Sequence, residues 1–336
     1  MGVLDAKQSN WMELDYGEKR SVLISGGSRT ERNFLVSNLI RDGNTLHLID
    51  FGGEWNTEDK TRSMNTRAVE KTVNLVGMRL GFASAEELSG CAKYIMQALG
   101  LRSPEMEAVL KKYLLEGYKE SGNSLSIREV ITSLTACKGE NMWEQDMANM
   151  LGDCLHCYGN IPDITFYIDN DCQLLDSSII WNLSGLDDTY TRITTYLIMY
   201  CLYQQKKRDS MGNNGQNKLV VAVNQIQYLD CDSNSIIGVC LADGWKYGLN
   251  LMLVTPLLNK NFSEAVLKAF VRKCVHFHFR TSAEEAVVIS WHLTDDYSAQ
   301  KEIYQKLVNL SKGEYLFFGL LPIDSAEEQQ RSNSTM

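Results

Sequence analysis

The chain has 336 residues, 44% of them hydrophobic, which is enough for a substantial core in one large domain or two ordinary ones. Its 33 basic and 42 acidic residues give a net charge of −9, so a broadly basic nucleic-acid surface is disfavoured, although a local basic strip on an assembled ring stays open. Nine cysteines without a secretory signal indicate reduced thiols and a cytoplasmic protein. The most apolar run, 196–203, is far shorter than the roughly 20 residues of a membrane span, so any membrane association is expected through partners.

Residues 21–40, SVLISGGSRTERNFLVSNLI, predict a buried strand at 22–25, a turn at Gly26 and Gly27, and then a helix. This order is the frame of a phosphate-binding loop, in which backbone N–H groups and a helix N-terminus face an anion. The working pattern is G-x-x-x-x-G-K-[ST]. Counted from Gly26, this chain has Glu31, Arg32 and Asn33 at the second glycine, the lysine and the hydroxyl positions.

Each of these three residues changes the chemistry of the loop. Glu31 adds bulk and a negative charge where a phosphate would lie, Arg32 offers a planar fork in place of an ammonium, and Asn33 offers an amide in place of a magnesium-binding hydroxyl. The alternative is an ordinary strand-to-helix turn. If nucleotide binding is retained, the sequence assigns it to Gly26, Gly27, Ser28, Arg29, Thr30, Glu31, Arg32, Asn33 and Asp50.

The next part of the chain changes from strands to helices. TLHLID at 45–50 predicts a second strand, FGGEWN a loop, and the polar residues 56–71 a loop with at most one exposed helix. Apolar residues at three- and four-residue spacing then predict helices at 85–99, 104–118, 127–136 and 142–158, with Ser84 and Ser103 as candidate N-caps. We therefore expect an all-helical insertion at about 84–160.

Strands and helices alternate through the second half of the chain. Strands are predicted at 177–183, 218–223, 249–255 and 274–279, helices at 188–207, 236–243, 262–270, 282–292 and 296–310, and a last strand pair around 312–321 with Gly313 at the turn. KLVVAV at 218–223 is typical of the centre of a parallel sheet. The pattern predicts an α/β fold with a mainly parallel sheet flanked by helices, over 18–321, between an N-terminal extension at 1–17 and a disordered tail at 322–336.

A second degenerate motif follows the strand at 218–223. In a nucleotide motor, an apolar strand ending in Asp-Glu supplies the aspartate that orders magnesium and the glutamate that polarises the attacking water. The sequence here is VVAVNQIQYL, with Asn224 and Gln225 at those positions. Both carboxylates are replaced by their uncharged amides, so the metal ligand and the base are lost.

The order of these segments resembles the motor domain of the HerA–FtsK superfamily, which has a P-loop NTPase (RecA-like) fold. The resemblance covers roughly residues 18–321 and is strongest to the HerA and type IV secretion conjugation ATPases, which share the insertion. Members generally form hexameric rings that hydrolyse ATP to move DNA or protein. Here the sensor strand ends at Thr255 and continues with Pro256, where the family usually has Thr-Gln. Arg272 and Arg280 are candidate trans-acting arginines, although a surface or salt-bridge role is the simpler interpretation.

The leading hypothesis is a pseudo-ATPase with no catalytic residues and no expected cofactor. It would form a homo- or hetero-oligomeric ring, with an active paralogue in the second case, and serve as a structural or partner-binding component of a conjugation, secretion or DNA-processing complex, reaching the inner face of the membrane only through that complex. The alternative is a divergent ATPase using ATP and Mg²⁺ for DNA or protein translocation, in which Arg32 clamps phosphate and Asp50 or Glu54 replaces the lost carboxylates. A third hypothesis keeps nucleotide as a structural ligand without hydrolysis. Nucleic acid stays open as a partner, but the net charge does not support it.

Two other groups of residues could suggest metal sites. Cys154, His156 and Cys157 lie in DCLHCYG, but a single Cys-x-x-Cys without a second pair is a weak signal, so helix packing is the simpler interpretation. His276 and His278 alternate along a predicted strand and therefore face one side. They predict a hydrogen-bonded pair within the sheet, and no metal is expected.

Overall fold

The computed structural model describes most of the chain. The described residues are 2–5, 21–39, 45–53, 55, 71–73, 78–121, 124–136, 141–156, 162–168, 175, 177–211, 218–258 and 262–318. The polar segment predicted at 56–70 and the tail at 322–336 lie outside these residues, so the predictions made for them stay predictions.

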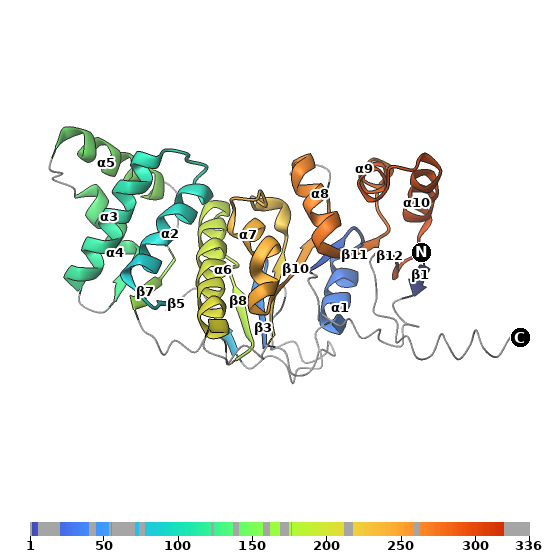
Figure 1. Cartoon of the computed structure of the whole chain (residues 1–336), viewed down its shortest axis with the longest axis horizontal. Coiled ribbons are helices and arrows are strands. Elements are labelled where there is room, and N and C mark those ends of the chain that lie inside the picture. Colours follow the sequence, from blue (N-terminus) through green and yellow to red (C-terminus); the bar gives the residue numbers. More distant parts are fainter. Residues whose placement is uncertain are drawn as a thin grey trace, which may run out of the picture.

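A nine-stranded sheet runs through the long axis of the molecule (Figure 1). Its strand order is β1-β12-β11-β2-β10-β9-β3-β8-β4. Every neighbouring pair from β11 to β4 is parallel, and β12 pairs antiparallel with β11 and with β1. The strands are β1 (Gly2–Asp5), β2 (Ser21–Ser25), β3 (Thr45–Asp50), β4 (Lys71–Val73), β8 (Ile179–Asn182), β9 (Leu219–Asn224), β10 (Leu249–Thr255), β11 (Cys274–Phe279) and β12 (Glu314–Phe318).

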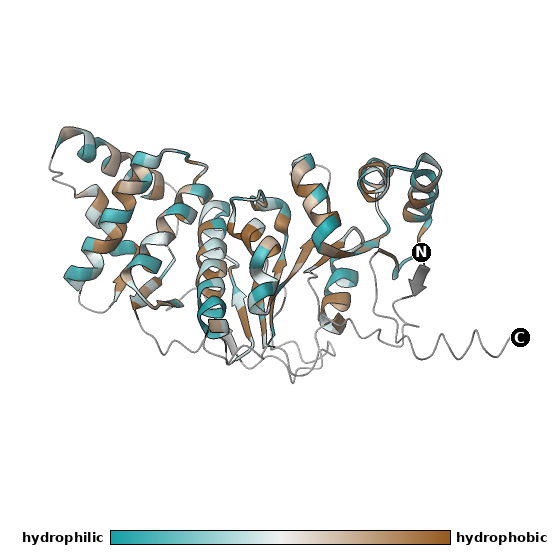
Figure 2. Ribbon diagram, in the orientation of Figure 1, coloured by the Kyte–Doolittle hydropathy of each residue, from teal (hydrophilic) through white to brown (hydrophobic). Residues whose placement is uncertain are grey.

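Both faces of the central strands are buried, which explains their continuous apolar sequences. In β9, Val221 and Val223 belong to the larger core, while Val220 and Ala222 belong to a second core on the other face with Leu35 of helix α1 (Arg29–Leu39). Figure 2 shows brown, hydrophobic strands at the centre and helices with both brown and teal surfaces around them. The predicted α/β fold with a mainly parallel sheet is confirmed.

The helices of the second half lie close to their predicted positions, and two short 3₁₀ turns that were not predicted accompany them. They are α6 (Asp188–Met211), η3 (Ile226–Tyr228), α7 (Ile236–Asp243), η4 (Gly244–Tyr247), α8 (Glu264–Lys273), α9 (Ala283–Leu293) and α10 (Tyr297–Asn309). Serine and aspartate N-caps fix where several of them begin; for example, Ser282 Oγ accepts the backbone N–H of Glu285.

The insertion predicted at about 84–160 contains the four predicted helices, and within these bounds the described residues depart from the prediction only at the two-residue strand β6 (Leu125–Ser126). Its helices are α2 (Ala85–Ala98), α3 (Pro104–Ser121), α4 (Ile127–Thr135) and α5 (Met142–His156). A three-stranded sheet in the order β5-β7-β6 accompanies them, formed by β5 (Met78–Phe82), β7 (Ile164–Ile168) and β6 (Leu125–Ser126). Strand β6 has two residues and interrupts the helical segment, and it is too short to give a two-residue periodicity.

The end of the sheet also differs from the prediction. Instead of a strand pair within 312–321, the single strand β12 pairs with β11 on one side and with β1 on the other. Strand β1 thus brings Gly2–Asp5, which we had assigned to an N-terminal extension, into the sheet. These pairings join segments far apart in the sequence, so no local signal could predict them.

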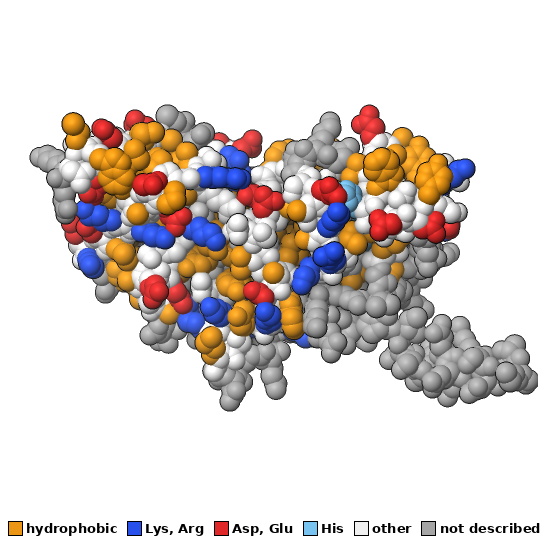
Figure 3. Space-filling model, turned by 45° about the horizontal axis from the view of Figure 1, so that its top comes forward, with side chains coloured by type: hydrophobic (Ala, Val, Ile, Leu, Met, Phe, Trp, Pro, Cys, Tyr) orange, Lys and Arg blue, Asp and Glu red, His pale blue; other side chains and the backbone are white. Residues whose placement is uncertain are grey.

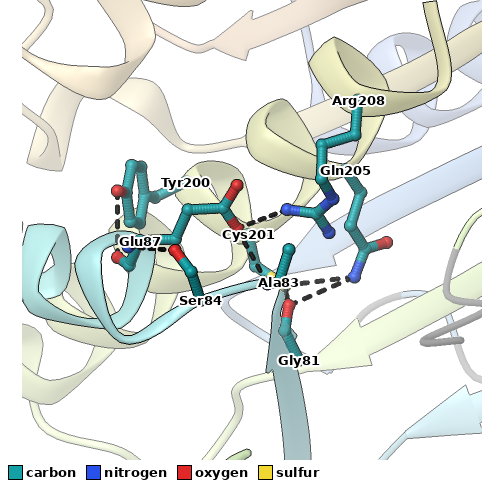
Figure 4. A network of polar contacts seen from close by, with 8 residues as sticks. All are labelled: Gly81, Ala83, Ser84, Glu87, Tyr200, Cys201, Gln205 and Arg208. Atoms are coloured by element: carbon teal, nitrogen blue, oxygen red, sulfur yellow. Dashed lines mark hydrogen bonds and ion pairs between the residues drawn. The ribbon is translucent and has the colours of Figure 1, made fainter. Parts of the chain in front are cut away.

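Polar contacts from α6 fasten the insertion to the central domain (Figure 4). Cys201 Sγ and Gln205 Nε2 lie 3.1 Å and 3.4 Å from the carbonyl oxygen of Gly81, in β5. Glu87 of α2 forms an ion pair with Arg208 and accepts the backbone N–H of Ala83 at 2.9 Å. The insertion is therefore anchored by side chains of a helix that packs on the main sheet.

Exposed apolar side chains gather at the two ends of the molecule in Figure 3, over the insertion and over α9 and α10. The largest are Trp143 and Met150 on α5, and Trp291 and Tyr297 at the other end. Among the described residues, no helix combines the length and apolar character needed to cross a bilayer.

Candidate functional site

The predicted site residues converge on the edge of the sheet where the parallel strands end. Ser25, the last residue of β2, lies level with Thr255 of β10 and His278 of β11. On the next strand, Asn224 lies level with Val254. The structure thus brings the glycine loop at 26–28, the Asn224–Gln225 pair and Pro256 to one edge of the sheet.

Glu31, at the start of the helix that follows the glycine turn, binds backbone N–H groups. Its Oε2 accepts the backbone N–H of Ser28 at 2.7 Å, and its Oε1 accepts the backbone N–H of Gly313 at 2.6 Å. The Ser28 hydroxyl in turn accepts the N–H of Glu31 at 3.3 Å, at the start of α1. A carboxylate belonging to the chain itself therefore binds the N-terminal end of the helix.

Several interactions determine the protonation state of Glu31. Partial burial by itself raises the pKa of this carboxyl. Hydrogen bonds from the Ser28 side chain and backbone and from the Gly313 N–H, together with the charge of Lys312, outweigh burial and hold the pKa below its usual value. Glu31 is therefore ionised at neutral pH and keeps a negative charge in the loop.

Arg32 is directed to the loop backbone. The residue is 8% exposed, and its Nη1 donates to the carbonyl oxygens of Gly26 at 2.8 Å and Gly27 at 2.7 Å. A guanidinium that holds these two carbonyls fixes the shape of the loop from inside. This contact differs from that of a lysine whose ammonium reaches a phosphate, and no sequence pattern predicts it.

The glycines allow a close approach, but it is the protein's own backbone that approaches them. Gly26 and Gly27 have positive φ angles of 72° and 63°, and a Cβ on Gly26 would lie 2.8 Å from the carbonyl oxygen of Phe279. A Cβ on Gly27 would lie 2.6 Å from Phe279 Cβ. The Gly27 N–H donates to the Arg280 carbonyl at 2.9 Å, so the segment after β11 closes over the loop.

The remaining loop residues lie at the surface. Ser28, Arg29 and Thr30 are exposed, and Asn33 is half-buried in the first turns of α1, where its carbonyl accepts the Ser37 hydroxyl at 2.8 Å. The candidate trans-acting arginines Arg272 and Arg280 are both exposed.

The Asn224–Gln225 pair has the backbone placement expected of a motor motif but not its charges. Asn224 is buried at the end of β9. Gln225 has φ 60° and ψ 46°, which is the left-handed conformation. Among the described residues, it is the only residue other than glycine with a positive φ. Thr255 Oγ1 lies 3.1 Å from Gln227 Oε1, which ties the sensor strand to the turn after Gln225.

Asp50 contacts its own turn. Its buried carboxylate accepts the backbone N–H of Gly52 at 3.2 Å through Oδ1 and that of Trp55 at 2.8 Å through Oδ2. These bonds explain the turn in FGGEW without a ligand. Glu54, the second proposed replacement carboxylate, lies outside the described residues.

The histidine pair is hydrogen-bonded as predicted. His276 Nδ1 lies 3.2 Å from His278 Nε2, and His278 Nδ1 lies 2.6 Å from the hydroxyl of Ser25, next to the loop. Cys154 is half-buried and His156 exposed, while Cys157 is not described. Within the described ranges, no three His, Cys, Asp or Glu side chains are grouped to hold a metal ion.

Arg32→Ala is expected to lower the free energy of unfolding by about 1–3 kcal/mol, because it leaves the Gly26 and Gly27 carbonyls without a charged donor. Urea denaturation of the variant measures this change. Arg280→Ala is the matched control: this arginine is exposed, and the expected change is within about 0.5 kcal/mol. Equal stability of the two variants would show that the buried guanidinium does not fix the loop.

No family model matches the chain, and no curated protein sequence matches it. Among solved structures it is similar to VirB4 of Thermoanaerobacter pseudethanolicus, with a TM-score of 0.61 and 14% identity over 89% of this chain and 86% of that one. It is also similar to the bacterial conjugative coupling protein TrwB in an unbound form, with a TM-score of 0.62 and 12% identity over 94% and 90% of the two chains.

A further match is plasmid coupling protein TrwB in complex with the non-hydrolysable GTP analogue GDPNP, with a TM-score of 0.57 and 12% identity over 90% of this chain and 84% of that one. At these identities the matches establish the fold, while the chemistry of each site must be judged from its own residues. The chain therefore has the P-loop NTPase fold, which it shares with VirB4 and TrwB.

Proposed function

We propose that this protein is a catalytically silent subunit with a motor-ATPase fold, acting as a structural or partner-binding component of a conjugation, secretion or DNA-processing assembly. The observation that carries the proposal is the Glu31 carboxylate, which accepts the Ser28 N–H at 2.7 Å inside the phosphate loop. An anionic side chain held there opposes a phosphate through charge repulsion and through competition for the same N–H donor.

The other site residues support the same conclusion. Arg32 is engaged with the loop carbonyls, and the Gly27 N–H is engaged with the Arg280 carbonyl. Asn224 and Gln225 provide no carboxylate for a metal or for activating water, and loss of a catalytic base alone costs about 10²- to 10⁴-fold in rate. The residues at this site therefore do not fit a magnesium–nucleotide complex.

The assembly belongs to the proposal as well. The similarity to VirB4 and to a conjugative coupling protein supports work within a conjugation or secretion complex, and the family resemblance implies a ring of identical subunits or one shared with an active paralogue. Attachment to the inner face of the membrane would come through that complex. Mass measurement in solution, with and without the products of neighbouring genes, tests the oligomeric state.

Isothermal titration with Mg-ATP tests the silent site directly. The expected result is no micromolar binding and no phosphate release, with an active P-loop ATPase titrated in parallel to validate the assay. Micromolar binding with turnover that disappears on Arg32→Ala would contradict the proposal and support a divergent ATPase. A melting shift with ADP and no phosphate release would contradict the expected absence of nucleotide and support a structural ligand.

A further inference from the structure

Exposed cationic residues from three segments lie around the glycine loop at 26–28 and Glu31. Arg29 begins α1, Arg280 follows β11, and Lys312 lies in the turn before β12; all three are exposed. Two hydrogen bonds hold these segments together: the Gly27 N–H donates to the Arg280 carbonyl at 2.9 Å, and the Gly313 N–H donates to the side-chain Oε1 of Glu31 at 2.6 Å. A chain of net charge −9 thus places a local group of cations at this edge.

An exposed apolar pair lies farther along the same edge. Tyr228 is 51% exposed in the turn after β9, and Leu257 is 39% exposed two residues beyond the end of β10. The two segments are neighbours, because Thr255 Oγ1 lies 3.1 Å from Gln227 Oε1 and 2.6 Å from the Leu257 carbonyl oxygen. Exposed apolar side chains on two neighbouring segments of one sheet edge mark a surface suited to contact with another molecule.

The cations and the apolar pair follow one another along five adjacent strands, in the order β12, β11, β2, β10, β9. Neighbouring strands lie about 4.8 Å apart, so the edge from β12 to β9 is about 19 Å long. An extended peptide covers this length with about six residues at about 3.3 Å each. We name this edge the rim and define it by Arg29, Arg280, Lys312, Tyr228 and Leu257.

The charges near the two ends of the rim differ. Arg280 and Lys312 lie at one end, whereas Asp230 and Asp232 follow Tyr228 at the other. Asp230 Oδ2 accepts Gln97 Nε2 at 2.8 Å, and Asp232 Oδ1 lies 3.2 Å from the Ser263 hydroxyl. A ligand therefore meets cations at the β12 end and apolar groups beside carboxylates at the β9 end, which favours acidic residues followed by apolar ones.

We propose that the rim binds a short acidic peptide segment of a partner protein, with its carboxylates on Arg280 and Lys312 and its apolar side chains on Leu257 and Tyr228. This inference rests on the proposed function, since it requires a loop that holds no nucleotide. Carboxylates suit the rim because they can pair with the exposed arginine and lysine side chains. The peptide need not enter the loop, where Glu31 already binds the helix N-terminus.

Fluorescence anisotropy with a labelled synthetic peptide, EEEGLFG, tests this proposal. The double variant R280E/K312E is expected to weaken binding at least about tenfold, because two attractive contacts become repulsive. Tyr228→Ala with Leu257→Ala is expected to weaken it by about tenfold without changing its salt dependence. The matched control K119E/K301E makes the same change in net charge at exposed lysines outside the rim and is expected to change binding less than twofold.

Three results would contradict the proposal that the rim binds an acidic peptide. The first is equal binding by the wild-type protein and R280E/K312E; the second is equal or tighter binding of the charge-reversed peptide KKKGLFG. The third is tighter binding of single-stranded oligothymidine than of EEEGLFG through the same residues, which would assign the rim to nucleic acid. Titration with Mg-ATP separates the two proposals: nucleotide binding contradicts the silent site, whereas loss of peptide binding without nucleotide binding contradicts the rim alone.

Discussion

The triple variant E31G/R32K/N33T is expected to bind Mg-ATP, whereas the wild-type protein is expected not to bind it. The variant restores the pattern G-x-x-x-x-G-K-[ST] over 26–33 and removes the carboxylate that accepts the Ser28 N–H. A ligand present at a hundred times its dissociation constant stabilises the folded state by about 2.7 kcal/mol. The melting temperature of the variant with and without Mg-ATP reports this gain. The roughly 1 kcal/mol that a glycine costs inside a helix is present in both measurements and therefore cancels.

Binding by this variant is expected without turnover. Asn224 and Gln225 still offer amides, so hydrolysis requires at least N224D and Q225E in addition. The single variant Asn33→Thr is the control, because it restores the hydroxyl and keeps Glu31. If Asn33→Thr bound nucleotide as well as the triple variant, the Glu31 carboxylate would not be the obstacle, and the argument for a silent site would lose its main support.

Local sequence patterns were sufficient for the frame of this site. A buried strand, two glycines and an amphipathic segment predict β2, the turn and α1, because each depends on neighbouring residues. The apolar run at 218–223 predicts a central parallel strand because both of its faces are buried. Since parallel strands end at one edge, the convergence of Gly26, Asn224 and Pro256 also follows from the order of elements.

The contacts that fill the site could not be predicted in the same way. Glu31 and Gly313 are separated by 282 residues, and the sequence contains no signal that a turn before β12 would reach the loop. The Asp50 carboxylate accepts two N–H groups of its own turn, although its place at a strand end is equally compatible with a metal ligand. Side-chain types and spacing predict what a residue can bind, while the partner it has depends on tertiary packing.

The second large effect is expected in the pH dependence of stability. His276 and His278 are buried and form one chain of hydrogen bonds in their neutral states. Ser25 donates to His278 Nδ1 at 2.6 Å, His278 Nε2 donates to His276 Nδ1 at 3.2 Å, and His276 Nε2 donates to the Phe270 carbonyl at 3.1 Å. This direction of donation is the one in which each neutral ring donates once and accepts once. One added proton therefore requires the His278 tautomer and the Ser25 hydroxyl to reverse, and a second proton would set two donors against each other.

Burial lowers the pKa of His276 to about 4, even though its bond to the Phe270 carbonyl acts in the opposite direction. Burial, and then the charge of His276, hold the pKa of His278 well below its usual value. Both histidines bind protons more readily in the unfolded chain, near pH 6.5, so the free energy of unfolding falls as the pH drops from about 6.5 towards 4. For His276 alone the loss is about 2 kcal/mol between pH 7 and pH 5 and about 3 kcal/mol in full.

Urea denaturation at pH 7 and pH 5 measures this loss. The double variant H276Q/H278Q is expected to lose most of the pH dependence in this range, whereas the control His156→Gln, at an exposed histidine on α5, is expected to retain it. Carboxylates held ionised in the folded state, such as Glu31, lose their contribution only at lower pH, which separates the two effects. A wild-type protein equally stable at pH 7 and pH 5 would contradict the neutral, hydrogen-bonded state of the two histidines.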